Sequence, residues 1–377
     1  MRRGHLVFLY PCHRLYLCIV RNSIGMITVT AGLSGKYFSA TVPDVELAVT
    51  GSKAEVALTV AGEEVFKETL YPVGGVISIV DLRGLVTPYA RRRLIATLTL
   101  DIREQDADEG TLGTQQLSAD IIYCEADFSA GTVPVDAADF CRTHFLTLLQ
   151  GPKISSEGRL EFLHYLGADP AQVTAEYADG STKQFEAVKV QGNDRYTTVD
   201  VSPHRFTTDG KRLIAFEVTA GERRQRFELD LSCPSCAPVL LFSNSFGCDE
   251  LVYCTGKHQV APSYKRNSAY FGGELKNYDI EETRAYKADT GYLTIHEAYW
   301  LDDLFRSPMV RLVTFSGQEP RVGKEVVVTE SKSEFSNLDE EMPRFTFTYQ
   351  LAQKNHNVIN VERAGRIFED AFDTTFN

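Results

Sequence analysis

The feature that most constrains the fold of this chain is the alternation of apolar and polar side chains in short segments. In residues 56–61, valine and leucine alternate with alanine and threonine. Residues 94–101 and 345–350 repeat this two-residue period. Successive side chains of a strand point to opposite faces, so each segment is expected to bury one face of a sheet. The sequence therefore predicts a mainly β protein with a few short helices.

Turn signals divide these segments into three consecutive β-sandwich-like domains. The 377 residues, 43% of them hydrophobic, suffice for two or three separate cores. We predict an N-terminal β-sandwich at 26–130 and an immunoglobulin-like β domain with a short leading helix at 131–236. A C-terminal β-rich domain with one covering helix follows at 237–360, and an aromatic tail at 361–377.

Three short helices are expected between the strands. Residues 81–90 favour the first helix. Asp136 is a suitable N-cap for the second, which the Gly-Pro pair at 151–152 should end. Thr294 and Glu297 have the spacing of a capping box and predict the start of the third.

The first 25 residues allow two interpretations. A basic start and an apolar run resemble a signal peptide, but Pro11 and His13 interrupt the run, and no Ala-x-Ala cleavage site follows. The interpretation that we favour is a non-native extension, with translation starting at Met26, where the β pattern begins. Cleavage or lipidation of residues 1–25 is the alternative.

Charge and hydropathy argue against a nucleic-acid partner and against a membrane-spanning segment. The 39 Lys and Arg residues are outnumbered by 51 Asp and Glu residues, which gives a net charge of −12. Such a chain is poorly suited to neutralise the phosphates of a nucleic acid. No stretch approaches the roughly 20 apolar residues that cross a bilayer. We expect neither a nucleic-acid partner nor a membrane span.

The cysteine pattern raises the question of zinc. Cys233, Cys236, Cys254 and His258 could supply three thiolates and one imidazole. Structural zinc sites usually combine two compact ligand pairs on tight turns, whereas Cys254 ends an apolar segment. We therefore predict no metal and no cofactor. Buried thiols, or a Cys233–Cys236 disulfide in an exported protein, are the remaining interpretations.

No catalytic motif is apparent in the sequence. Adjacent acidic residues such as Glu281 and Glu282 would point to opposite faces of a strand, so they make a poor catalytic pair. Neither a Gly-x-Ser-x-Gly motif nor a phosphate-binding glycine loop is present. We predict that the protein is not an enzyme.

Two basic clusters and one aromatic stripe are candidate interfaces. The arginines could contact acidic surfaces of neighbouring copies and set their register, although solvated turns are the plainer interpretation. The phenylalanines recur every four residues, as on one helix face, and would dock onto their own chain or onto a partner. The candidates are Arg91, Arg92, Arg93, Arg223, Arg224, Arg226, Phe368, Phe372 and Phe376.

Several short motifs are spread along residues 26–360. They are FSATVPD at 38–44, DL at 81–82, LFSNSFGC at 241–248, YCTGK at 253–257, NY at 277–278, ADTG at 288–291, LDDL at 301–304 and Ser307. Together they resemble the uncharacterised tail-region structural proteins of Bacteroides-type prophages, of the distal-tail or tail-tip kind.

This resemblance implies a non-enzymatic protein of virion assembly. Such a protein would be made in the bacterial cytoplasm, reside in the virion tail and bind other phage tail proteins, further copies of itself in a ring, or both. The alternative is an exported Bacteroidetes cell-surface protein, either adhesin-like or carbohydrate-binding.

Overall fold

The computed structural model describes residues 27–126, 135–192, 195–316, 319–334 and 341–353. It contains 57% strand and 12% helix, arranged as several sheets in multiple domains with three short helices, so the predicted mainly β fold is confirmed. The predicted N-terminal extension and aromatic tail lie outside the described residues. Within the described part of the chain, no helix is long and apolar enough to cross a membrane.

The first group of strands forms two sheets around one core. The strands are β1 (Thr28–Ala31), β2 (Ser34–Phe38), β3 (Val45–Ala48), β4 (Lys53–Val60), β5 (Glu63–Leu70), β6 (Val76–Ile79), β7 (Ile95–Gln105) and β8 (Thr111–Ile122). The larger sheet has the order β2-β8-β7-β4-β5 and the smaller one β1-β3-β6. The alternating Val56, Leu58 and Val60 are all buried in this core, as their period predicts.

Helix α1 (Leu82–Arg93) covers part of the same core with Leu82, Val86 and Ala90. Asp81 caps its start by accepting a hydrogen bond from Gly84 N. The helix runs beyond the predicted end at residue 90, so the three arginines of the first basic cluster occupy its last turn rather than a loop. Positive charge at this end interacts favourably with the helix dipole.

The second group of strands forms another two-sheet unit. The strands are β9 (Lys153–Ser155), β10 (Phe162–Leu166), β11 (Ala171–Tyr177), β12 (Thr182–Glu186), β13 (Val188–Gly192), β14 (Tyr196–Asp200), β15 (Leu213–Ala220) and β16 (Arg223–Leu229). One sheet has the order β12-β11-β15-β16-β9 and the other β10-β14-β13. Stacked Phe216 and Phe227, with ring centroids 4.7 Å apart, lie in the core of this unit.

Helix α2 (Ala137–Thr143) begins at the predicted N-cap, where Asp136 accepts hydrogen bonds from two backbone N–H groups. It ends well before the predicted stop at residues 151–152, which corrects that prediction. The next apolar residues enter three different cores: Phe145 that of the second unit, Leu146 a core shared between the units, and Leu149 that of the third. One continuous helix face could not serve all three.

The third group of strands forms a single sheet covered by one helix. The elements are β17 (Val239–Ser243), β18 (Asp249–Tyr253), β19 (Gln259–Phe271), β20 (Glu274–Tyr292), α3 (Ile295–Arg306), β21 (Val310–Ser316), β22 (Glu319–Lys332) and β23 (Arg344–Leu351). The sheet order is β18-β17-β21-β22-β23-β20-β19. Trp300, Leu301 and Leu304 of α3 pack into the core beside Phe345 and Phe347 of β23. This unit therefore has the expected covering helix on one seven-stranded sheet.

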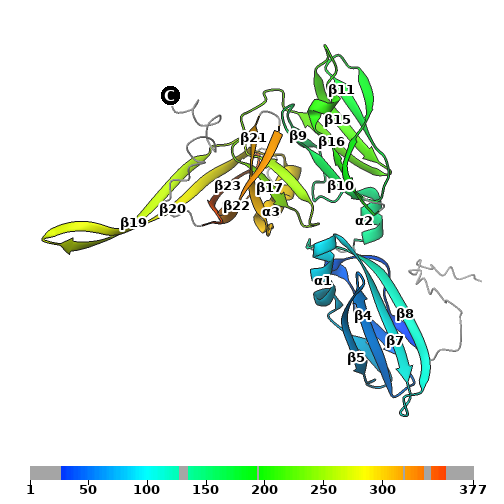
Figure 1. The fold of residues 1–377 in the computed structure, drawn as a ribbon. Coiled ribbons are helices and arrows are strands. Elements are labelled where there is room, and N and C mark those ends of the chain that lie inside the picture. Colours follow the sequence, from blue (N-terminus) through cyan, green and yellow to red (C-terminus); the bar gives the residue numbers. More distant parts are fainter. Residues whose placement is uncertain (1–26, 127–134, 193–194, 317–318, 335–340, 354–377) are drawn as a thin grey trace, which may run out of the picture.

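The three units share a small core of aromatic side chains. Phe38 ends β2, Phe140 lies on α2, and Phe246 lies in the turn between β17 and β18. The ring centroid of Phe140 lies 5.5 Å from that of Phe38 and 5.5 Å from that of Phe246. All three rings are buried, together with Ile122 and Leu146. Apolar burial thus joins the units where they meet (Figure 1).

The start of α3 provides a test of local stability. The predicted capping box is present: Thr294 Oγ1 accepts from Glu297 N, and Glu297 Oε2 accepts from Thr294 N. Glu297 Oε1 also accepts from Ile154 N of β9 at 2.8 Å. We expect Thr294→Ala to lower the free energy of unfolding by about 1 kcal/mol. Glu297→Ala should cost about 2 to 3 kcal/mol, because a charged acceptor is lost from two elements.

Urea denaturation would measure both values. Asp302→Ala is the matched control, because it removes a surface ion pair with Arg306 on the same helix, which contributes about 0 to 1 kcal/mol. Equal effects of the Thr294 and Glu297 variants would show that the contact with β9 does not contribute.

Candidate functional site

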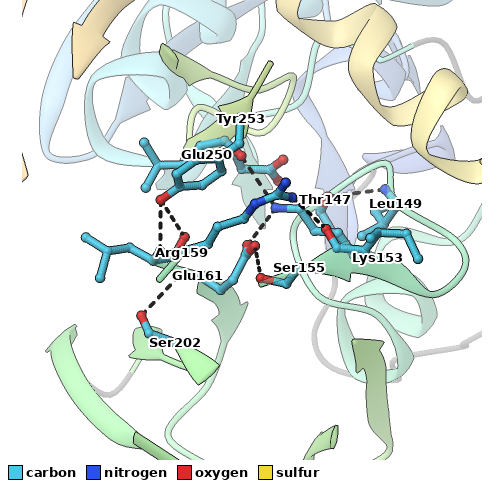
Figure 2. A network of polar contacts seen from close by, with 12 residues as sticks. Thr147, Leu149, Lys153, Ser155, Arg159, Glu161, Ser202, Glu250 and Tyr253 are labelled. Atoms are coloured by element: carbon cyan, nitrogen blue, oxygen red, sulfur yellow. Dashed lines mark hydrogen bonds and ion pairs between the residues drawn. The ribbon is translucent and has the colours of Figure 1, made fainter. Parts of the chain in front are cut away.

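A network of buried polar groups lies between the second and third units (Figure 2). Lys153 Nζ is 2.6 Å from Glu161 Oε2, and Ser155 Oγ donates to the other oxygen of Glu161 at 2.8 Å. Lys153 Nζ also lies 4.5 Å from the ring centroid of Trp300. Glu161 N donates in turn to Ser202 Oγ. These contacts connect β9 and the start of β10 to α3.

A second buried carboxylate, Glu250, completes this network. Asn244 Nδ2 donates to its Oε1 at 2.7 Å, and the Trp300 indole N–H donates to its Oε2. Burial raises the pKa of Glu250, although Lys153 and both donors oppose that rise. Two acidic groups beside a lysine form an arrangement that could transfer protons. These acidic groups could not be recognised from the sequence, because they lie far apart in the chain.

The space at this network limits its chemistry. The cavity that Lys153, Glu161 and Glu250 line has a volume of about 20 Å³, roughly that of one water molecule. An organic substrate would not fit without displacing Trp300 or Leu146. The network therefore holds two units together and has no room for a substrate.

A larger cleft of about 380 Å³ lies between the first unit, α2 and the second unit. This volume falls in the range of small-molecule sites, and most charged groups in the wall are basic. The arginines of the wall and their carboxylate partners are Arg142 with Glu222, Arg195 with Asp120, and Arg223 with Asp169. Each of these three arginines thus has a carboxylate nearby, which reduces its attraction for an anionic ligand.

The zinc candidates Cys233, Cys236, Cys254 and His258 make separate contacts. Cys233 is exposed, whereas Cys254 is buried, and burial raises the pKa of its thiol. Cys236 Sγ lies 3.7 Å from the Arg159 guanidinium. His258 Nε2 lies 2.8 Å from the Tyr349 hydroxyl, and the two rings are stacked. In the described ranges no three metal-binding side chains form a group that could hold an ion, and the described cysteines are free thiols.

The arginine candidates differ in their exposure. Arg223 is only 5% exposed, so it does not offer its charge to a neighbouring copy, and this corrects its place among the interface candidates. Its guanidinium donates to the backbone carbonyls of Cys141, Leu166 and Ala220 and pairs with Asp169. The alternation of β16 explains this, because Arg223 points inward.

The other arginines lie at the surface with partners in their own chain. Their contacts are Arg91 with Glu125, Arg93 with Glu63 and the Ala61 carbonyl, Arg224 with Glu217, and Arg226 with Glu176 and Glu228. Arg92 is exposed. The aromatic candidates Phe368, Phe372 and Phe376 lie outside the described residues.

The structure adds a surface that the sequence analysis missed. Strands β19 and β20 extend beyond the rest of their sheet as a two-stranded hairpin, here called the arm, which turns at Gly272 and Gly273 (Figure 1). Both glycines have positive φ, which a tight turn requires. The exposed large apolar side chains of the arm are Val260, Tyr264, Tyr270, Phe271, Leu275, Tyr278 and Ile280.

Most of these side chains share one face of the arm. Directly opposite residues lie on the same face, and every second residue returns to it. Val260 lies opposite Tyr286, which is buried in the core of the third unit, and Tyr270 lies opposite Leu275. Tyr264 belongs to the same row. The face of the sheet that is buried in the core therefore continues along the arm, where these apolar side chains share it with Arg266, Glu282 and Arg284.

Comparison with known proteins identifies no family for this chain. No family model matches the sequence, and no curated protein matches it. Among solved structures, the chain is similar to one described as "Crystal Structure of Rst D1-D2", with a TM-score of 0.24 and 8% sequence identity. The similarity covers 54% of this chain and 99% of that chain. A TM-score this low supports no conclusion about fold or function.

The buried Arg223 yields a test that separates two neighbouring arginines. Arg223→Met should lower the free energy of unfolding by about 2 to 3 kcal/mol, because several carbonyl groups lose a charged donor. Arg224→Met should change it by no more than about 0.5 kcal/mol, because this side chain is 73% exposed. Chemical denaturation checks both values. A similar small effect of the two variants would show that the Arg223 contacts add no stability.

His164 gives a prediction for the dependence of stability on pH. Its Nε2 donates to the Asp249 carbonyl at 2.8 Å, and its Nδ1 lies 2.7 Å from the Tyr196 hydroxyl. Burial lowers the pKa of His164 to about 4. The unfolded chain, with a histidine pKa of about 6.5, therefore takes up this proton first. Stability from this group is complete above pH 6.5 and is lost as the pH falls towards 4, approaching about 3 kcal/mol.

His164→Gln should remove this part of the acid sensitivity. Urea unfolding at pH 7.5 and pH 4.5 would compare the loss of stability in the wild type and the variant. His204→Gln, at a less buried position, is the control and should keep the wild-type loss. Equal losses in the wild type and in His164→Gln would contradict the assignment of the proton to His164.

Proposed function

We propose that this chain is a non-enzymatic structural protein of a phage or prophage tail, which acts through protein–protein interfaces. The observation that supports the proposal best is the arm. A two-stranded hairpin is marginally stable in water by itself. The exposed apolar face of the arm, with Tyr270 76% exposed, would gain free energy from burial against another protein.

The connections between the units also favour a structural role. The shared phenylalanine core and the network around Lys153 join all three units through buried contacts. An assembly protein has to hold its binding surfaces at fixed positions relative to one another, which such contacts support. The partners under this proposal are other phage tail proteins, further copies of the chain in a ring, or both.

Analysis of virions from a strain that carries the gene tests this proposal. After prophage induction, mass spectrometry should detect the chain in purified particles, and deletion of its gene should yield particles with incomplete tails. The control is a strain whose chain carries Glu157→Lys, which reverses an exposed charge away from the arm. This strain should yield normal particles. Detection of the chain on the cell surface and not in particles would overturn the proposal in favour of an exported adhesin-like or carbohydrate-binding protein.

A further inference from the structure

Strands β19 and β5 lie in different parts of the molecule, and each is an edge strand of its sheet. Strand β19 ends the seven-stranded sheet, and β5 ends the five-stranded sheet of the first unit. An edge strand presents backbone N–H and C=O groups that can accept a further strand. Pro262 lacks a donor, so pairing on β19 would involve the outer part of the strand, residues 263–271.

The charges on the two edges are complementary. The outer part of β19 carries Lys265 and Arg266 and no acidic residue, although Lys265 lies opposite Glu281 of β20. Strand β5 carries Glu63, Glu64 and Glu68. Its one lysine, Lys67, pairs with Glu55 of the neighbouring β4. A basic edge and an acidic edge attract each other and disfavour pairing of either edge with itself.

The apolar surfaces beside the two edges also match. Tyr264 and Tyr270 lie on β19, and Tyr270 is at the outer end of the arm. Directly after β5, Tyr71 and Val73 are 70% and 85% exposed. Burial of such side chains against each other contributes to association, while the charges set orientation.

The two edges cannot meet within one chain as it is folded. Figure 1 shows the tip of the arm and β5 at separate extremities of the molecule. A contact between them therefore joins two copies. Because different surfaces meet, the contact is head-to-tail, and repetition gives a ring or a filament.

We propose that the outer part of β19 of one copy docks along β5 of the next copy, so that the arm links copies head to tail. This inference rests on the proposed function in that it assigns the surfaces of a self-assembly. Arg266, which also stacks over Tyr264, and Lys265 point to opposite faces of β19. Glu64 and Glu68 also lie on opposite faces of β5, so in the docked pair each basic side chain has a carboxylate on its own face. The aromatic residues of the arm cover Tyr71 and Val73.

Charge reversal tests the pairing. Variant one is Lys265→Glu with Arg266→Glu, and variant two is Glu64→Lys with Glu68→Lys. In each variant alone the two edges have like charges, so the dissociation constant of self-association should rise by about tenfold or more. In an equal mixture, the acidic arm of variant one faces the basic β5 of variant two, and the unchanged edges also match. The mixture should therefore recover the association of the wild type.

Analytical ultracentrifugation of the full chain over a range of concentrations measures these constants. Glu157→Lys with Asp209→Lys is the control, because it changes the net charge as variant two does at exposed positions away from both edges. It should associate as the wild type does. Thermal melting of every variant shows whether it is folded.

The inference would be overturned by a wild type that stays monomeric at high micromolar concentration, or by a mixture that associates no better than its components. A wild type that associates regardless of both reversals would also overturn it, because other surfaces would then carry assembly. These results do not bear on whether the chain is present in virions. Conversely, absence of the chain from virions would contradict the proposed function but not self-association through the arm.

Discussion

The contact between Phe38, Phe140 and Phe246 is the constraint on which the arrangement of this protein depends. Each ring comes from a different part of the chain, and each is buried against the other two within one apolar cluster that also contains Ile122 and Leu146. An edge-to-face pair and a stacked pair both require defined ring positions. The positions of α2, the end of β2 and the turn after β17 are therefore coupled. One small apolar cluster thus helps to orient the three units relative to one another.

The buried polar network acts on the same arrangement in a different way. Lys153, Glu161 and Glu250 would each be costly to bury alone, so their hydrogen bonds and charges must match closely. A displaced unit would leave at least one of these groups without its partners. Apolar contact stabilises the junction, and the polar groups restrict it to one geometry. Arg223 has the same role where α2 meets β16.

Local sequence signals predicted the parts of the fold that depend on neighbouring residues. The alternation at Val56, Leu58 and Val60 and the capping box at Thr294 both appear as predicted. The end of α2 could not be predicted, because Phe145, Leu146 and Leu149 are directed by three cores that form from distant segments. Arginines 223 and 224 look alike in sequence, and only the strand's orientation separates them.

The arm could not be recognised from the sequence for a related reason. Its strands carry many polar residues, and the apolar row is divided between them, so neither strand alone has a strong period of two. The glycine pair at 272–273 was the one available signal. The buried acids were missed because Glu161 and Glu250 meet only through the fold.

The length of β20 has a mechanical consequence. This strand runs without interruption for 19 residues, from the outer turn of the arm to the interior of the sheet, where it pairs with β23. Its hydrogen bonds to β23 lie across the strand direction. A pull on the tip of the arm along its axis would load these bonds together, in shear, and not one after another. The arm is therefore built to carry tension into the body of the protein.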